Sequence, residues 1–184
     1  MNEMPPYNLV RDTVFSRCRK YRFTLWRKFD SALLGKPLFD DGNVSKDGYV
    51  QFIGLNPSTA DETVDDPTIR RCIGYCRSWG YSELCMTNIF PFRATDPKDM
   101  LAHDEPIEMA IENAKWIEMV AEKAAIIVCA WGANGSHKTR QNKVIKHLRD
   151  VRKFTLHHLG LNNDGSPKHP LYLKKTLTPI IYAP

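Results

Sequence analysis

Short apolar runs alternate with segments of helical periodicity between residues 49 and 159, and this alternation limits the folds open to the chain. The runs cover residues 49–53, 84–88, 125–130 and 155–159. Buried parallel strands read as continuous apolar runs, and parallel neighbours need a crossover that is usually a helix. The sequence therefore predicts an α/β fold of three layers, α/β/α, with a mainly parallel sheet of about four strands.

Three helices are expected between these runs. In the first, Asp66 suits the N-cap, Pro67 the first helical position and Gly80 the position beyond the end. The second begins at Pro106, and the third is a basic segment over about 137–150. The apolar stripes are Ile69, Cys72, Ile73, Cys76 and Trp79 in the first helix, and Ile107, Ala110, Ile111, Ala114 and Ile117 in the second.

Residues 1–48 form an N-terminal extension of what we expect to be one α/β domain over residues 1–184. The first fifteen residues are expected to fray, and residues 30–48 are a turn-rich variable loop. Between them, apolar Tyr21, Phe23 and Leu25 alternate with polar Arg22, Thr24 and Arg27. This near period of two predicts a half-buried strand that is antiparallel or lies at an edge.

Composition narrows the classes of protein further. A length of 184 residues suits one hydrophobic core, and 26 Lys+Arg against 21 Asp+Glu leave a charge of 26 − 21 = +5, which permits an anionic partner. No apolar run approaches the roughly 20 residues of a membrane span, and the first residues lack the apolar segment of a signal peptide. An odd count of five cysteines does not suggest a disulfide framework. We therefore expect a cytoplasmic protein with no membrane partner.

Metal and cofactor sites lack sequence support. Cys72 and Cys76 lie on an apolar helix face without a second ligand pair, so we expect no metal. Neither a P-loop nor a dinucleotide fingerprint occurs, so we expect no cofactor.

In open α/β sheets, ligands bind beyond the carboxyl ends of the strands, so the loops there are candidates for function. In the loop after the first parallel strand, Gly54 lets the backbone approach a ligand closely, and Leu55 is a candidate for contact with a base. Asn56 could aim a water molecule. Ser58 and Thr59 are candidates for phosphate contact. The alternative is that Asn56 and Ser58 only build a turn.

The loop after the second strand begins with Asn88, whose donor and acceptor match the edge of a nucleobase. Phe90 and Phe92 could stack on a base, and Arg93 could contact phosphate, although core rings and a solvated charge are the alternatives.

A histidine before a proline, His169, lies in the last rim loop and could donate to charge that develops on a ligand oxygen. It could equally be structural. Leu171 could insert between stacked bases. Lys143 and Lys146 of the basic helix could meet a phosphate backbone, or form an ordinary solvated face.

These segments carry two resemblances. Nearly the whole chain resembles a bacterial and phage family known as domain of unknown function 1643. The matching stretches are 21–26, 52–61, 65–71, 88–93, 130–132 and 169–173. More distantly, the order of motifs is similar to the uracil-DNA glycosylase superfamily, which has a four-stranded parallel sheet between helices.

The second resemblance implies roles for three residues. Asn56 of the Gly-x-Asn-Pro loop would orient water, Asn88 would read the base edge, and His169 would stabilise the leaving base. Ser58 stands where the superfamily often has glycine, and Leu171 stands where it usually has serine.

These observations favour a cofactor-free hydrolase of an N-glycosidic bond, of DNA-glycosylase type, in DNA repair or modification. Its partner would be DNA or a free nucleoside or nucleotide. The alternative is a non-catalytic module that binds a base, a nucleotide or DNA in DNA modification or phage–host conflict. A third hypothesis is a protein that uses the fold only as an interaction scaffold.

Overall fold

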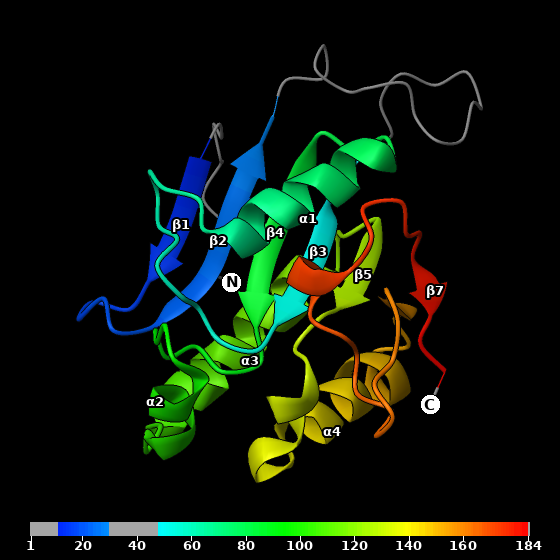
Figure 1. Ribbon diagram of the computed structural model, residues 1–184. Coiled ribbons are helices and arrows are strands. Elements are labelled where there is room, and N and C mark those ends of the chain that lie inside the picture. The colour runs from blue at the N-terminus through cyan, green and yellow to red at the C-terminus, as the bar shows by residue number, and fades with distance from the viewer. Residues whose placement is uncertain (1–10, 30–47, 184) are drawn as a thin grey trace.

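The structure is a computed structural model that describes residues 11–29 and 48–183. These residues form a seven-stranded mixed sheet and four α-helices (Figure 1), which confirms the predicted α/β class. The strands are β1 (Arg11–Phe15), β2 (Arg22–Lys28), β3 (Val50–Gly54), β4 (Glu83–Asn88), β5 (Ile126–Cys129), β6 (Leu156–His158) and β7 (Ile180–Ile181). The helices are α1 (Pro67–Ser78), α2 (Pro97–Ala102), α3 (Ile107–Ala121) and α4 (Arg140–Ile145).

The strand order is β1-β2-β4-β3-β5-β6-β7. The four strands from β4 to β6 are parallel to one another, whereas β1, β2 and β7 join antiparallel. The sheet is thus larger than the expected four strands. The prediction that residues up to 15 fray is wrong for residues 11–15, because β1 pairs with β2; residues 1–10 lie outside the described part.

The prediction of a half-buried strand near residue 21 is correct in its direction and wrong in its burial. Strand β2 is antiparallel, but it lies between β1 and β4, so it is interior. Arg22 and Arg27 are each only 2% exposed. The polar side of the strand is buried because these arginines donate hydrogen bonds to the loop between β3 and α1 instead of to water. Residues 30–47 of the expected variable loop lie outside the described residues.

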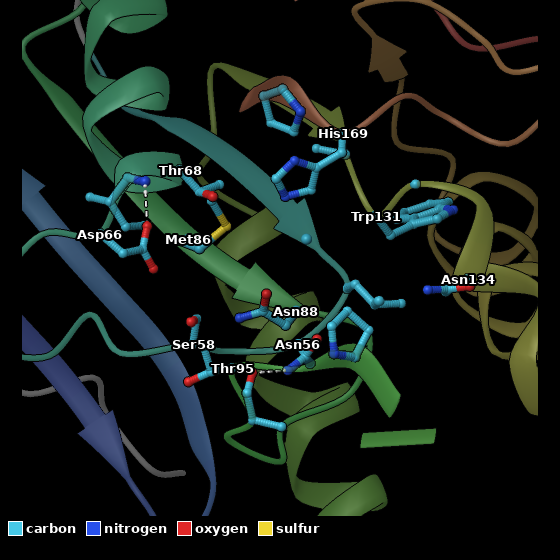
Figure 2. A pocket seen from close by; sticks show the side chains of 18 of the residues that line it. Asn56, Ser58, Asp66, Thr68, Met86, Asn88, Thr95, Trp131, Asn134 and His169 are labelled. Atoms are coloured by element: carbon cyan, nitrogen blue, oxygen red, sulfur yellow. Dashed lines mark hydrogen bonds between the residues drawn. The ribbon is translucent and has the colours of Figure 1, made fainter. Parts of the chain in front are cut away.

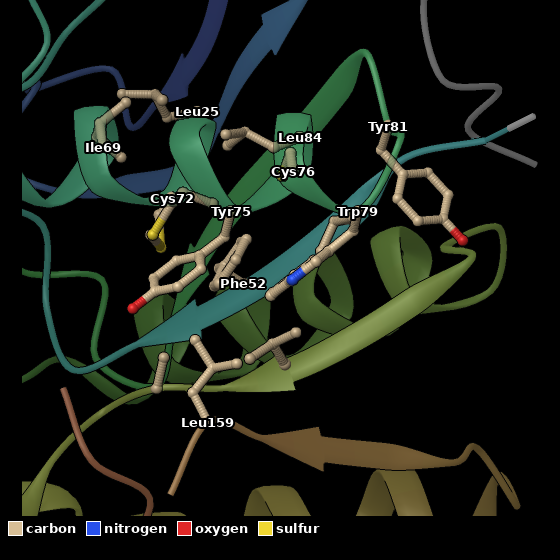
Figure 3. Packing of buried hydrophobic residues seen from close by; sticks show 14 of the residues in the cluster. Leu25, Phe52, Ile69, Cys72, Tyr75, Cys76, Trp79, Tyr81, Leu84 and Leu159 are labelled. Atoms are coloured by element: carbon tan, nitrogen blue, oxygen red, sulfur yellow. The ribbon is translucent and has the colours of Figure 1, made fainter. Parts of the chain in front are cut away.

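Helix α1 covers one face of the parallel strands (Figure 3). Its side chains Cys72, Tyr75 and Trp79 pack with Phe52 of β3 in one buried cluster. The predicted helix start is confirmed: the Asp66 carboxylate accepts from the backbone N–H of Ile69 at 2.9 Å.

The opposite face is covered by α3 and α4. Ile53 follows Phe52 and points to the other side of the sheet, where it clusters with Ile117 of α3 and Ile145 of α4. The predicted apolar stripe of α3 is only partly a core face, because Ile107 and Ile111 are 68% and 51% exposed.

Two further segments differ from expectation. The basic helix predicted over 137–150 is interrupted: Lys138 and Thr139 have positive φ angles of 49° and 55°, and a π-helical turn, Lys146–Val151, follows α4. The segment between β4 and α3, where no helix was predicted, contains α2.

The described part of the chain has no helix long and apolar enough to cross a membrane. All five cysteines lie in it as free thiols, and four are buried.

Candidate functional site

A cavity of about 460 Å³ lies at the carboxyl ends of β3, β4 and β5 (Figure 2). Its wall includes Gly54 and Asn88 at the ends of two adjacent strands, and Trp131 just after the third. His169 reaches it from the loop beyond β6. Asn56, Asn88 and His169 therefore line one cavity, although 113 residues separate the first from the last in the sequence.

Backbone hydrogen bonds hold the first two rim loops together. The N–H of Ile89 donates to Gly54 O at 2.9 Å, that of Phe90 to Leu55 O at 2.9 Å, and that of Ala94 to Pro57 O at 2.9 Å. The parallel ladder between β3 and β4 is thereby extended past the strand ends. This extension fixes Asn56 and Asn88 relative to each other.

Asn56 is oriented by the loop after β4. Its Nδ2 donates to the carbonyls of Ala94, at 2.8 Å, and Pro57, at 3.1 Å. Because both partners are carbonyl oxygens, they require the amide nitrogen, and the orientation of the side chain is fixed. The Oδ1 is consequently the atom that can accept a hydrogen bond from a molecule in the cavity.

Asn88 is 3% exposed, and its Nδ2 has no hydrogen-bond partner among the described residues. Its Oδ1 lies over Gly54, where a Cβ would come within 2.7 Å. The position thus requires glycine because of the neighbouring carboxamide. From behind, the buried Asn113 of α3 donates to the backbone carbonyl of Asn88 at 2.8 Å and holds the end of β4.

His169 faces the two asparagines across the cavity (Figure 2). Its Nδ1 accepts from the backbone N–H of Leu171 at 3.4 Å, at the start of a short 3₁₀ turn. An accepting Nδ1 carries no proton, so the neutral ring carries its proton on Nε2. Burial lowers the pKa of His169, while the charge of Asp66 opposes the shift. The site therefore holds a neutral imidazole whose Nε2–H can donate.

Two charged residues that were not predicted also line the cavity, Arg22 and Asp66. Arg22 donates from Nη1 to Ala60 O at 2.6 Å, and Arg27 pairs through Nε with Asp65 at 2.6 Å. Both arginines of β2 thereby fix the loop between β3 and α1.

The loop between β3 and α1 also contains the acidic residues Asp61 and Glu62, and both have partners within the protein. Asp61 accepts from the backbone N–H groups of Thr63 and Val64, at 2.8 and 2.9 Å. Glu62 pairs with Arg19 at 2.7 Å. These carboxylates serve the structure of the loop.

Other predicted residues are divided between the cavity and its surroundings. Leu55 and Ser58 line the cavity, and Thr59 is exposed outside it. Phe90 and Phe92 lie in and against the core cluster on the α3 side, and Phe92 stacks on His103 with ring centroids 3.7 Å apart. Both rings lie outside the cavity lining.

The predicted phosphate contacts lie elsewhere. Arg93 packs over the ring of Phe15, with its guanidinium 4.9 Å from the centroid. Lys143 and Lys146 are exposed on α4 and the turn after it. Leu171 contributes its backbone to hold His169, whereas its neighbour Tyr172, 86% exposed, lines the cavity.

Three residues line the cavity although the sequence analysis did not place them there, and the sequence signals that could have indicated them differ. Asp66 was identified only as a helix cap, and Tyr172 follows His169 closely enough to suggest the same rim. The direction of the Arg22 side chain depends on a β-bulge, which the sequence does not reveal. Phe15 opposes Arg22 and Val14 opposes Thr24, so Phe23 is the extra residue, and such bulges redirect side chains.

In the described ranges, no group of three or more His, Cys, Asp or Glu side chains could hold a metal ion. In a comparison with known protein families, the model of a family described as "Protein of unknown function (DUF1643)" matches residues 22–171. No curated protein and no solved structure was found to match the chain.

Proposed function

Because the chain belongs to the DUF1643 family, whose description names no activity, its function has to be argued from the site, and we propose that it hydrolyses an N-glycosidic bond. The substrate would be a base in DNA, or a free nucleoside or nucleotide. In this proposal the sheet and its helices are a variant of the three-layer uracil-DNA glycosylase fold, with β4-β3-β5-β6 as its parallel centre.

One observation carries the proposal: a fixed acceptor, an unpartnered carboxamide donor and a neutral imidazole donor line the same cavity. These are Asn56 Oδ1, Asn88 Nδ2 and His169 Nε2. A nucleobase is flat and carries donors and acceptors on its edge, so it matches such a set. A buried amide donor without a protein partner gains a hydrogen bond when a ligand carbonyl enters.

The reaction divides between these groups. As the bond between the sugar C1′ and the base nitrogen breaks, positive charge develops on the sugar and negative charge on the departing base. Asn56 Oδ1 would hold a water molecule whose oxygen bonds to C1′ as the bond from C1′ to the base nitrogen breaks. The base leaves with the electron pair of that bond, and the proton that the water loses passes to the base through solvent. The weakly basic amide contributes by positioning the water.

His169 would stabilise the leaving base. An Nε2–H directed at a base oxygen stabilises the negative charge that develops there, by roughly 2.7–4 kcal/mol per donor in comparable sites. A neutral ring suits this role because the Leu171 N–H already occupies Nδ1 and keeps the proton on the cavity side.

A base in duplex DNA would have to leave the stack to reach the cavity. Tyr172 supports this possibility because it is exposed at the rim, 6.2 Å from His169 between ring centroids. Its ring is placed to stack on a neighbouring base. The formal charge of +5 is compatible with an anionic polymer.

The experiment is to incubate the purified protein with DNA carrying modified bases and with nucleosides, and to measure abasic sites and free base. Asn56→Ala and His169→Ala should each reduce release at least 100-fold, while Asn163→Ala, an exposed asparagine, should not. Full activity of the double variant would refute the assignment. Base binding without any product would identify the alternative, a binding module.

A further inference from the structure

Arg22 is a buried cation on the wall of the cavity, beyond the three residues used above. Arg22 is 2% exposed, and its side chain reaches the cavity from β2, which lies outside the parallel centre of the sheet. The bulge at Phe23 changes the alternation of side chains at this end of the strand. Arg22 thus reaches the cavity from a strand, whereas Asn56 and His169 reach it from loops.

The charge of Arg22 is incompletely compensated. Nη1 donates to Ala60 O at 2.6 Å, but Nε has no hydrogen-bond partner among the described residues. Burial lowers the pKa of the guanidinium to about 10, and Arg93 and Arg27 act in the same direction. A buried charged group without full hydrogen bonding is costly, and a suitable ligand removes part of that cost.

Asp66 is the carboxylate whose charge favours the charged form of Arg22. It belongs to the helix, however: one oxygen accepts from Ile69 N–H, and the positive end of the α1 dipole lies beside it. The position of Asp66 is thus fixed by the helix that it caps.

Asn88 adds a second donor to the same wall. Its Nδ2 is buried and unpartnered among the described residues, as is Arg22 Nε, and both residues line the cavity. Two such donors are matched by a group rich in acceptor oxygens, and hydrogen bonds to a charged acceptor are stronger than neutral ones. The cavity, at about 460 Å³, lies within the range that takes drug-sized ligands and has room for a substituted base.

We infer that the wall formed by Arg22 and Asn88 is a subsite for an anionic oxygen group of the substrate, either a carboxylate on the base or the phosphate of a nucleotide. This inference rests on the proposed base-binding function and names the class of substrate. The deep burial of both residues favours the base carboxylate, since a phosphate would enter from the sugar side.

The test is direct binding, measured by calorimetry without turnover. The probes are uracil, 5-carboxyuracil and orotate, which carries its carboxylate at position 6. The fourth probe is 5-carbamoyluracil, which is neutral and has the shape of 5-carboxyuracil. Deoxyuridine with and without its 5′-phosphate distinguishes the second source of the anion. We expect at least one carboxylated base to bind about tenfold or more tighter than 5-carbamoyluracil.

Arg22→Met should abolish this preference and Arg22→Lys should keep part of it, since the second variant retains the charge. Arg149→Met is the matched control, because it removes a partly exposed arginine that lies outside the cavity lining and is paired with Asp150. Thermal melting establishes that each variant is folded. Should Arg22→Met fail to fold, the comparison of carboxylated and carbamoylated bases on the wild type and Arg22→Lys decides.

Equal binding of carboxylated and neutral bases, with no gain from the 5′-phosphate, would overturn the inference. A preference for the phosphate that depends on Arg22 would support the anion subsite and assign it to a nucleotide. Uracil binding tests the proposed function separately: it should survive Arg149→Met and be lost in Asn88→Ala. If it is absent in the wild type, the proposed function itself fails.

Discussion

Replacing Gly54 by alanine perturbs the floor of the cavity without changing any polar group. An alanine Cβ would lie 2.7 Å from Asn88 Oδ1 and 3.5 Å from Met86 Sδ, so the carboxamide has to move. Asn88 is 3% exposed, which leaves it little space to turn. The substitution should therefore displace the side chain that we assign to base recognition.

The magnitude follows from two opposing effects. Overpacking a buried site costs about 1–3 kcal/mol. Replacing glycine restricts the unfolded chain and returns about 0.4–1 kcal/mol, because Gly54 does not have a positive φ angle. The free energy of unfolding should fall by about 1–2 kcal/mol, and base affinity by about tenfold or more if two hydrogen bonds to the carboxamide are lost.

Urea denaturation and calorimetric titration with base measure the two effects. Gly74→Ala is the matched control, because a Cβ at that exposed position on α1 has no neighbour within 4 Å. It should stabilise the helix by about 0.5–1 kcal/mol and leave binding unchanged. If Gly54→Ala is as stable as wild type and binds base equally well, the reasoning about Asn88 is refuted.

Three further predictions concern the supports of the site. Asp66→Ala should lower the free energy of unfolding by about 1 kcal/mol, since it removes the cap of α1, whereas Asp66→Asn should keep most of it in urea denaturation. Asn113→Ala should cost about 1–3 kcal/mol and weaken base binding, because the carbonyl of Asn88 loses its donor; unchanged affinity by calorimetry would argue against this support. Because burial lowers the pKa of folded His169, the unfolded chain takes up a proton first as pH falls below about 6.5, and stability drops there. The wild type should lose more stability than His169→Gln between pH 7 and 5, and parallel curves would contradict the assignment.

The sequence predicts the parallel centre of the fold because the strands there are apolar runs and a helix signal separates each run from the next. Asp66, Pro67 and Gly80 even place the ends of α1. The outer strands escape the pattern for a physical reason: β1 begins with polar residues, β7 has only two residues, and both depend on pairing with a sheet that already exists. The burial of Arg22 is equally invisible, since its partners lie in a loop 38 residues away.

The same division holds at the site. Asn56, Asn88 and His169 were predictable because loops after parallel strands meet at one edge of the sheet. Phe90 and Phe92 were open to two interpretations, and the core alternative describes their placement, because the loop that carries them turns back toward α3. The exposed aromatic side chain at the rim of the cavity belongs to Tyr172, which the sequence analysis did not name for stacking on a base.

Hydrolysis in water enriched in ¹⁸O tests the central claim most directly, that water held in this cavity attacks the sugar carbon. With a base-releasing substrate, mass spectrometry should find one ¹⁸O atom on C1′ of the sugar product and none in the free base, and Asn56→Ala should lose this product. Label in the base, or cleavage that persists undiminished in Asn56→Ala, would contradict the mechanism.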